Sequence, residues 1–352
     1  MNKEKIVLVT GAAGFIASKT IELLLKQGYR VVGIDNMNDY YDVRLKDYRL
    51  SRLLGNELYL QNKDARRSIF HIQNLNEITR SDKKFIFQLM DIENLSELEK
   101  LFECYSFEAV FNLAARAGVR YSMKDPFVYM RTNAMGTLNI LECMRKYGVK
   151  KHIMASTSSL YAGQKMPFTE DLPVNTPLSP YAASKKAAEL MAYSYYKLYD
   201  IDSSILRYFT VFGPAGRPDM SIFRFIKWIY EGVPLEVFGD GTQSRDFTYV
   251  DDIARGTVAA IKPVGYEIIN LGGGRNPITI NKVIYFIENT LGRKAVIHNK
   301  SFHIADVKET WADISKAKTV LNWEPDISPE EGFQRTADWA ISHIDWLKDI
   351  RV

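Results

Sequence analysis

Residues 5–17 read Lys-Ile-Val-Leu-Val-Thr-Gly-Ala-Ala-Gly-Phe-Ile-Ala, which is a short β-rich run, a glycine-rich turn and the start of a helix. The unbroken apolar run is typical of a parallel strand buried on both faces. Gly11 and Gly14 let the backbone turn sharply and approach a pyrophosphate at the positive end of the helix. Asp35 lies 24 residues after Gly11, where an acid binds a ribose 2′-hydroxyl and repels a 2′-phosphate. The stretch therefore predicts a dinucleotide site that prefers NAD to NADP.

The first half of the chain continues to alternate strands with helices. Further strands are predicted over residues 29–34, 84–89, 109–114, 152–155 and 203–208, and helices over 15–27, 94–104, 133–147 and 182–199. Repeated strand–helix units imply a parallel sheet with right-handed crossovers and helices on both faces. We therefore predict an α/β fold of the Rossmann type, with a doubly wound parallel sheet.

The domain organisation follows from a change of pattern near residue 211, where the chain becomes irregular and richer in Pro, Gly and aromatic residues. We assign residues 1–210 to the NAD-binding domain and 211–352 mainly to a smaller α/β domain that binds substrate. The stretch 235–262 is expected to return to the first domain. The polar stretch 55–83 is expected to be a surface insertion with a short helix.

Composition excludes several classes of protein. The 352 residues are 46% hydrophobic and 25% charged, as in an ordinary globular chain, and no apolar run approaches the ~20 residues of a membrane span. We expect a cytoplasmic protein without a membrane partner, because the N-terminus enters a strand with no leader-like stretch. The net charge of +4 is spread along the chain, and no basic–aromatic patch indicates nucleic acid. The histidines show no metal-ligand spacing, so no metal site is predicted.

Five tyrosines stand four residues before a lysine, a spacing used by oxidoreductases, and context must choose among them. A catalytic pair needs both side chains on one helical face near the carboxyl edge of the sheet. Tyr181 and Lys185 fit, because Ser179-Pro180 precedes them and an alanine-rich helix follows. The ammonium and a cationic nicotinamide should lower the pKa of the Tyr181 phenol. Tyr181 could then take a substrate hydroxyl proton while hydride leaves the same carbon.

Motifs along nearly the whole chain resemble those of the extended short-chain dehydrogenase/reductase family, in particular its nucleotide-sugar epimerases and dehydratases. The matching stretches are residues 10–16, 91–92, 112–115, 133–139, 179–185, 245–252 and 270–273. The resemblance implies that Thr157 acts with Tyr181 and Lys185 in catalysis. It implies that NAD is contacted by Gly11, Ala13, Gly14, Phe15, Ile16, Asp35, Asn36, Asp91, Ile92, Leu113, Ala114, Ala115, Asn133, Tyr181, Lys185 and Tyr208.

The residues after Thr157 bear on the type of reaction. The 4,6-dehydratases of the family carry Asp-Glu there, and its uronate decarboxylases carry Glu at the position of Ser159. This chain has Ser158 and Ser159 instead, so it lacks the acid–base group that elimination needs. Simple redox chemistry at the sugar C4 remains, and the resemblance implies a 4-epimerase.

Residues 38–46, 115–122 and 206–220 resemble the UDP-glucuronate 4-epimerases within that family. Relatives that act on neutral hexoses carry Asn at the position of Thr210 and lack an equivalent of Arg217. A guanidinium beside hydroxyl groups suits a C6 carboxylate. The resemblance implies interconversion of UDP-glucuronate and UDP-galacturonate through a 4-keto sugar. The implied contacts to the UDP-sugar are Gly118, Val119, Arg120, Ser158, Ser159, Thr210, Arg217, Val237, Arg245 and Asp306.

Alternatives to this reaction remain open. One is epimerisation of UDP-glucose or UDP-N-acetylglucosamine, and another is a catalytically silent relative that senses NAD. The intact Thr157, Tyr181 and Lys185 argue against the silent relative. We further expect a homodimer in which the helices at 94–104 and 182–199 pair across a two-fold axis, as in relatives.

Overall fold

The computed structural model describes residues 5–57, 61–274, 277–301 and 308–352. Its central sheet has eight strands. Their order across the sheet is β12 (Tyr266–Leu271), β7 (Asp202–Tyr208), β6 (Lys151–Thr157), β5 (Ala109–Asn112), β1 (Ile6–Thr10), β2 (Arg30–Asp35), β4 (Phe85–Leu89) and β3 (Glu77–Thr79). Every neighbouring pair is parallel except β3 and β4. The predicted Rossmann-type α/β fold is confirmed.

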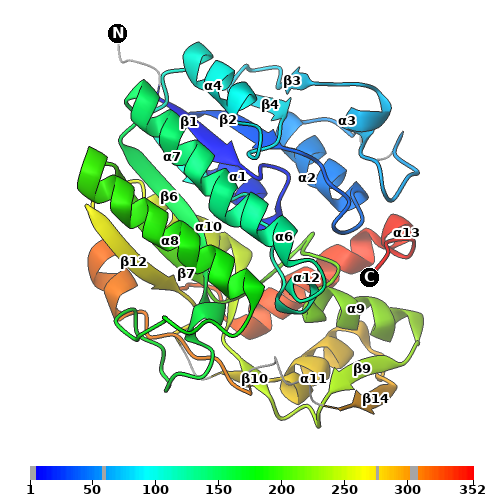
Figure 1. Ribbon diagram of the computed structural model, residues 1–352. Helices are drawn as coiled ribbons and strands as arrows, with labels where there is room; N and C mark the ends of the chain where they lie inside the picture. Colours follow the sequence, from blue (N-terminus) through cyan, green and yellow to red (C-terminus); the bar gives the residue numbers. More distant parts are fainter. Residues whose placement is uncertain (1–4, 58–60, 275–276, 302–307) are drawn as a thin grey trace.

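Helices cover both faces of this sheet. Because successive side chains of a strand point to opposite faces, Val7 and Val9 of β1 enter one apolar core while Leu8 enters another. The first core is shared by α1 (Phe15–Lys26), α2 (Arg44–Leu54) and α10 (Val250–Ala259), and the second by α4 (Leu95–Cys104), α7 (Gly136–Tyr147) and α8 (Pro180–Tyr199). Figure 1 shows α7 and α8 side by side in front of the sheet.

The chain after β7 builds a further layer around its own apolar core, at the lower right of Figure 1. Its elements are β8 (Thr210–Phe212), α9 (Ser221–Glu231), β9 (Leu235–Phe238), β10 (Ser244–Arg245), β11 (Phe247–Tyr249), β13 (Ile278–Thr279), α11 (Ile280–Leu291), β14 (Ile297–Lys300), α12 (Pro329–Ser342) and α13 (Ile344–Leu347). β8 pairs with β11, β9 with β14 and β10 with β13. The division into domains 1–210 and 211–352 stays a prediction. β12 crosses that boundary, because it forms one edge of the central sheet.

Two segments differ in detail from the sequence-based expectation. The helix expected from residue 133 is preceded by α6 (Pro126–Tyr129) and a π-helical segment, η2 (Met130–Met135). The stretch 55–83 contains the short helix α3 (Ile69–Ile72) and also β3, which extends the sheet. Phe70 of α3 is buried, and its ring lies 4.7 Å from that of Phe87 in β4. The stretch therefore contributes to the core, which its polar composition concealed.

Three shorter segments complete the described helices. They are α5 (Val119–Ser122), the 3-10 turn η3 (Ser158–Tyr161) and the π-helical segment η4 (Ala317–Leu321). α5 is the next element after the carboxyl end of β5, and η3 directly follows that of β6. They therefore lie at the edge of the sheet where ligands bind in this class of fold.

Candidate active site

The turn between β1 and α1 has a shape that only glycine permits. Gly11 has a φ of +69°, and a Cβ atom there would lie 2.8 Å from the Ala114 Cα. Gly14 caps α1 with no side-chain hydrogen bond, and its N–H donates to the Gly11 carbonyl at 2.7 Å. A tight turn at the uncapped start of a twelve-residue helix fits a pyrophosphate group. Phe15 and Ile16 open that helix, next to Ala13 in the turn.

Asp35 ends β2 as predicted, and its carboxylate faces this turn. It accepts hydrogen bonds from the Ala13 N–H at 3.2 Å and the Met37 N–H at 2.8 Å. The Lys46 ammonium of α2 lies 3.4 Å from the same carboxylate, and both side chains are almost fully buried. Lys46 was not predicted, and its only signal in the sequence was its place in the stretch 38–46. The Lys46 ammonium thus lies beside the carboxylate that is predicted to bind ribose.

Two more predicted cofactor residues meet beside Asp35. The Asn36 side-chain amide donates to the Asp91 carboxylate at 2.7 Å. Ile92 follows Asp91 and packs so closely on Gly136 of α7 that a Cβ there would lie 2.6 Å from its Cδ1. The segments after β2 and β4 are therefore fixed to each other and to α7.

Residues 113–116 are held between β1 and α8. The Thr10 hydroxyl accepts a hydrogen bond from the Ala114 N–H at 3.0 Å. The Asn133 side chain bonds both the N–H and the carbonyl of Arg116, at 2.8 and 2.9 Å, and also donates to the Ser184 hydroxyl at 2.9 Å. Asn133 thereby links the predicted cofactor segment, which includes Leu113 and Ala115, to the helix that carries Tyr181 and Lys185.

The predicted catalytic residues come together at the carboxyl end of β6. Tyr181 lies in the first turn of α8 and is buried, and Lys185 donates from Nζ to the Ala155 carbonyl at 2.7 Å. Thr157 ends β6, and its hydroxyl accepts a hydrogen bond from the Ser159 N–H at 3.1 Å. Ser158 and Ser159 open η3 directly after it.

The electrostatics of this pair include a desolvation cost that the sequence did not reveal. Burial raises the pKa of the Tyr181 phenol, and the Thr157 hydroxyl and the Arg217 guanidinium oppose that rise without cancelling it. Burial also lowers the pKa of Lys185 to about 8. The expected lowering of the Tyr181 pKa is therefore not found in the protein alone, because desolvation of the phenolate outweighs the neighbouring positive charge.

Tyr208, another predicted cofactor residue, ends β7 with its hydroxyl turned into the protein. That hydroxyl is 2.8 Å from the Thr257 hydroxyl on α10. Burial raises the pKa of the Tyr208 phenol above its usual value. Any contact of Tyr208 with a cofactor therefore uses its ring or its backbone.

Arg217 and Thr210 line a common cleft. The cleft lies between the start of α1, at Phe15, and the loop after β8. The Arg217 guanidinium donates from Nε and Nη2 to the two carboxylate oxygens of Asp219, at 3.0 and 2.6 Å. Asp219 therefore fixes one edge of the guanidinium, a role that the sequence analysis did not foresee.

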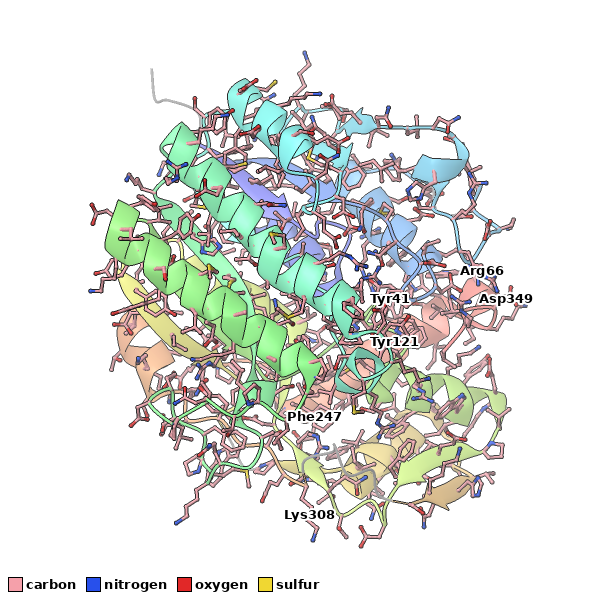
Figure 2. The ribbon with its side chains drawn as sticks, in the orientation of Figure 1. Tyr41, Arg66, Tyr121, Phe247, Lys308 and Asp349 are labelled. Atoms are coloured by element: carbon pink, nitrogen blue, oxygen red, sulfur yellow. The ribbon has the colours of Figure 1, made fainter. Side chains whose placement is uncertain are left out.

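Tyr40 is a second neighbour of Arg217 that was not predicted. Its ring centre lies 5.7 Å from the Arg217 guanidinium and 5.4 Å from that of Arg116. Its hydroxyl donates to the Ala117 carbonyl at 2.6 Å. Figure 2 shows its neighbours Tyr41 and Tyr121 close together, where the end of the sheet meets the C-terminal layer. The stretch 38–46, noted above only for its resemblance, thus places an aromatic ring against the predicted carboxylate-binding arginine.

The other predicted substrate residues that the structure describes lie on α5, β9 and β10. Gly118 and Val119 begin α5, and the Arg120 guanidinium stacks 4.0 Å from the centre of the Phe238 ring, next to the buried Val237 of β9. Arg245 of β10 donates to the carbonyls of Ser244 and Lys308, at 2.8 and 3.2 Å. Asp306 lies outside the described residues.

Within the ranges given above, no group of three or more His, Cys, Asp or Glu side chains could hold a metal ion. In the same ranges, no helix is both long and apolar enough to cross a bilayer.

Comparison with known proteins agrees with this geometry. Residues 7–272 match the model of the NAD dependent epimerase/dehydratase family. The UDP-glucuronate 4-epimerase of Thermodesulfobacterium geofontis is 57% identical over 345 residues, 98% of this chain and 99% of the relative. UDP-glucuronate 4-epimerase 4 of Arabidopsis thaliana is 36% identical over 96% of this chain and 75% of its own length.

A solved structure agrees as well. The UDP-glucuronic acid 4-epimerase of Bacillus cereus, in complex with UDP-glucuronic acid and NAD, superimposes with a TM-score of 0.83 at 39% identity. The match covers 96% of this chain and 99% of that one.

Proposed function

The chain belongs to the NAD-dependent epimerase/dehydratase family, and we propose that its cleft interconverts UDP-glucuronate and UDP-galacturonate. The observation that carries this reaction is the 57% identity, over nearly the full length of both chains, to a UDP-glucuronate 4-epimerase. The joint placement of Tyr181, Thr157 and Arg217 around one site supports it. The enzyme is an isomerase that uses NAD and leaves the overall redox state of its substrate unchanged.

The chain's own residues fit NAD. The turn at Gly11 and Gly14 can receive the pyrophosphate, and Asp35 can receive the adenosine ribose. When bound, NAD supplies a hydride acceptor and donor at C4, so that the sugar passes through a 4-keto form. Lys185 can donate to a ribose hydroxyl while its Nζ stays anchored on the Ala155 carbonyl.

Tyr181 acts as the base in this proposal. Its phenolate takes the proton from the sugar O4 and later returns it, and the Thr157 hydroxyl hydrogen-bonds the same oxygen. A buried phenol with a raised pKa stays protonated at neutral pH and cannot accept the proton in that form. The Lys185 ammonium, and the positive charge of the oxidised nicotinamide when it is bound, both favour the phenolate. Proton abstraction is thereby confined to the loaded enzyme.

Arg217 recognises the C6 carboxylate of the sugar. Asp219 occupies Nε and Nη2 on one edge of its guanidinium, so Nη1 is left to donate toward the substrate. Thr210, Ser158 and Ser159 add hydroxyl groups that can donate to the same carboxylate. A C4 ketone makes this carboxylate prone to leave as CO₂. We infer that these donors keep it charged and poorly oriented for that loss.

Purified protein incubated with UDP-glucuronate, UDP-glucose or UDP-N-acetylglucosamine tests the assignment. NMR should detect UDP-galacturonate from the first substrate, with kcat/KM well above the values for the two neutral sugars. Faster turnover of either neutral sugar would move the assignment to that substrate. Absence of turnover with all three would instead favour a silent relative.

We also propose a homodimer. The exposed apolar side chains Leu190, Met191, Tyr193 and Leu198 lie on α8, and Phe127, Met130 and Met135 lie on the adjoining α6 and η2. A patch on adjacent helices suits self-association across a two-fold axis. On α4, by contrast, the described exposed apolar residue is Leu95. Light scattering of the parent and of Leu190→Glu tests this, since the variant should be monomeric.

A cytoplasmic location is proposed as well. Cys104 and Cys143 are free thiols, which suits a reducing compartment. Fractionation of cells that express the chain tests this location.

A further inference from the structure

A buried ion pair lies one helical turn beyond Lys185 and takes no part in the chemistry above. Glu189 of α8 and Arg207 of β7 have side chains that are each 1% exposed. The guanidinium donates from Nε and Nη2 to the two carboxylate oxygens of Glu189, at 2.9 and 2.8 Å. Burying two charges costs several kcal/mol per ion, and well-packed apolar residues would often stabilise a fold as well. Stability alone therefore does not account for the pair.

The carboxylate of Glu189 also ties the helix to the strand that carries Thr157. The Ser156 hydroxyl, directly before Thr157 in β6, donates to Glu189 Oε1 at 2.7 Å. Arg207 Nη1 in turn donates to the Tyr161 hydroxyl at 2.8 Å, and that hydroxyl donates to Asn270 of β12 at 2.8 Å. One network thus fixes α8 to β6, β7, β12 and η3, directly behind the proposed catalytic groups.

The same carboxylate acts on the charge of Lys185. Glu189 opposes the effect of burial and raises the pKa of the Lys185 ammonium, because the two side chains lie one turn apart on α8. Other groups face Glu189 as well. The Lys186 ammonium lies 3.6 Å from its carboxylate, and the Tyr266 hydroxyl of β12 donates to its backbone carbonyl at 3.1 Å. On the catalytic side, Tyr181 is faced by Thr157 and Arg217, and by the Tyr40 phenol.

We propose that Glu189, held by Arg207 and Ser156, is a positioning residue for the reaction. It sets α8 against β6, and its negative charge favours the ammonium form of Lys185 in the Tyr181–Lys185 pair. This inference rests on the proposed function. It adds a buried carboxylate, remote from substrate and cofactor, as a group that biases the pair toward a charged lysine and an ionised phenol.

The test compares the parent with Glu189→Gln/Arg207→Met, which removes both charges together. Removing only Glu189 would leave a buried unpaired guanidinium and could unfold the chain, whereas removing both partners is often tolerated. In the double variant the acid limb of the kcat profile for UDP-glucuronate should move to lower pH, because Lys185 gives up its proton more readily. The plateau value of kcat should fall by up to about tenfold for each pH unit of that shift. The reason is that, once Tyr181 and Lys185 together have lost one proton, more molecules keep the remaining proton on Tyr181. KM and bound NAD per chain should stay unchanged.

Two further variants separate positioning from folding. Lys151→Met removes another ion pair, which Lys151 forms with Asp202 at the first residues of β6 and β7, away from the site. This variant should lower the melting temperature but leave the pH profile unchanged. Ser156→Ala removes only the hydroxyl that fixes Glu189, and it should lower kcat a few-fold at constant KM. A parent-like plateau and acid limb in the double variant, or a parent-like kcat in Ser156→Ala, overturns the proposal. Absence of UDP-glucuronate turnover by the parent would instead overturn the proposed function.

Discussion

Replacing Arg217 by alanine should remove the preference for a carboxylated sugar without unfolding the protein. The Asp219 side chain, which loses its partner, is 40% exposed, so water can solvate the released carboxylate. An ion pair with such an exposed member contributes at most about 1 kcal/mol to the free energy of unfolding. The melting temperature should therefore change little.

The effect on turnover should be much larger. A hydrogen bond to a charged group contributes about 1.5–3 kcal/mol. If Arg217 makes one such bond to the C6 carboxylate in the transition state, kcat/KM for UDP-glucuronate should fall about 10- to 150-fold. The value for UDP-glucose, which has no carboxylate, should change less than about threefold. A 4-keto sugar whose carboxylate is no longer held should also lose CO₂, so a pentose product should accumulate.

NMR of reaction mixtures measures both substrates and the pentose product in one experiment. Arg66→Ala serves as the control, because that arginine is exposed in the stretch 55–83 and should change neither value. Unchanged turnover of UDP-glucuronate by Arg217→Ala, with no pentose formed, would refute the role given to this guanidinium.

Three other changes have definite expected outcomes. Tyr181→Phe should lower kcat by about 10²- to 10⁴-fold at constant melting temperature, and near-parental activity would remove Tyr181 from catalysis. Gly11→Ala should reduce the NAD bound per purified chain, because its Cβ would lie 2.8 Å from the Ala114 backbone, whereas Gly55→Ala at φ +74° has open space and should keep its NAD. Burial raises the pKa of Asp47 to about 6, so its ionisation penalises the folded state as pH rises from about 4 to 6. Asp47→Asn should match the parent in melting temperature at about pH 4 and exceed it above about pH 6, and an equal difference at both would contradict the shift.

The fold was predictable because its determinants are local. The apolar run of β1, the glycine turn and Asp35 each follow from their neighbours in sequence, and repeated strand–helix units define the sheet. β3 was missed because its short polar run gains its place only by pairing with β4. The helical turns before residue 133 were also missed. Asp125 caps α6 and Pro126 opens it, whereas the sequence periodicity had placed the start of the helix at residue 133.

The site was predictable only where a motif names its residues. Tyr181 and Lys185 share one helix, so their spacing, together with the sequence around them, singled them out. Tyr40 and Asp219 act on Arg217 through space, and no spacing rule links residue 40 to residue 217. The burial of the Tyr181 phenol was not foreseen for the same reason, because desolvation depends on how many segments cover the phenol.

Retention of the C4 hydrogen tests the central claim most directly. UDP-glucuronate is incubated with the purified enzyme in deuterated water, and the product is examined by proton NMR. Internal hydride transfer and return predict UDP-galacturonate with its original hydrogen still on C4. Deuterium at C4 of the product would mean that this hydrogen leaves as a proton to solvent, and it would contradict the proposed role of Tyr181 and NAD.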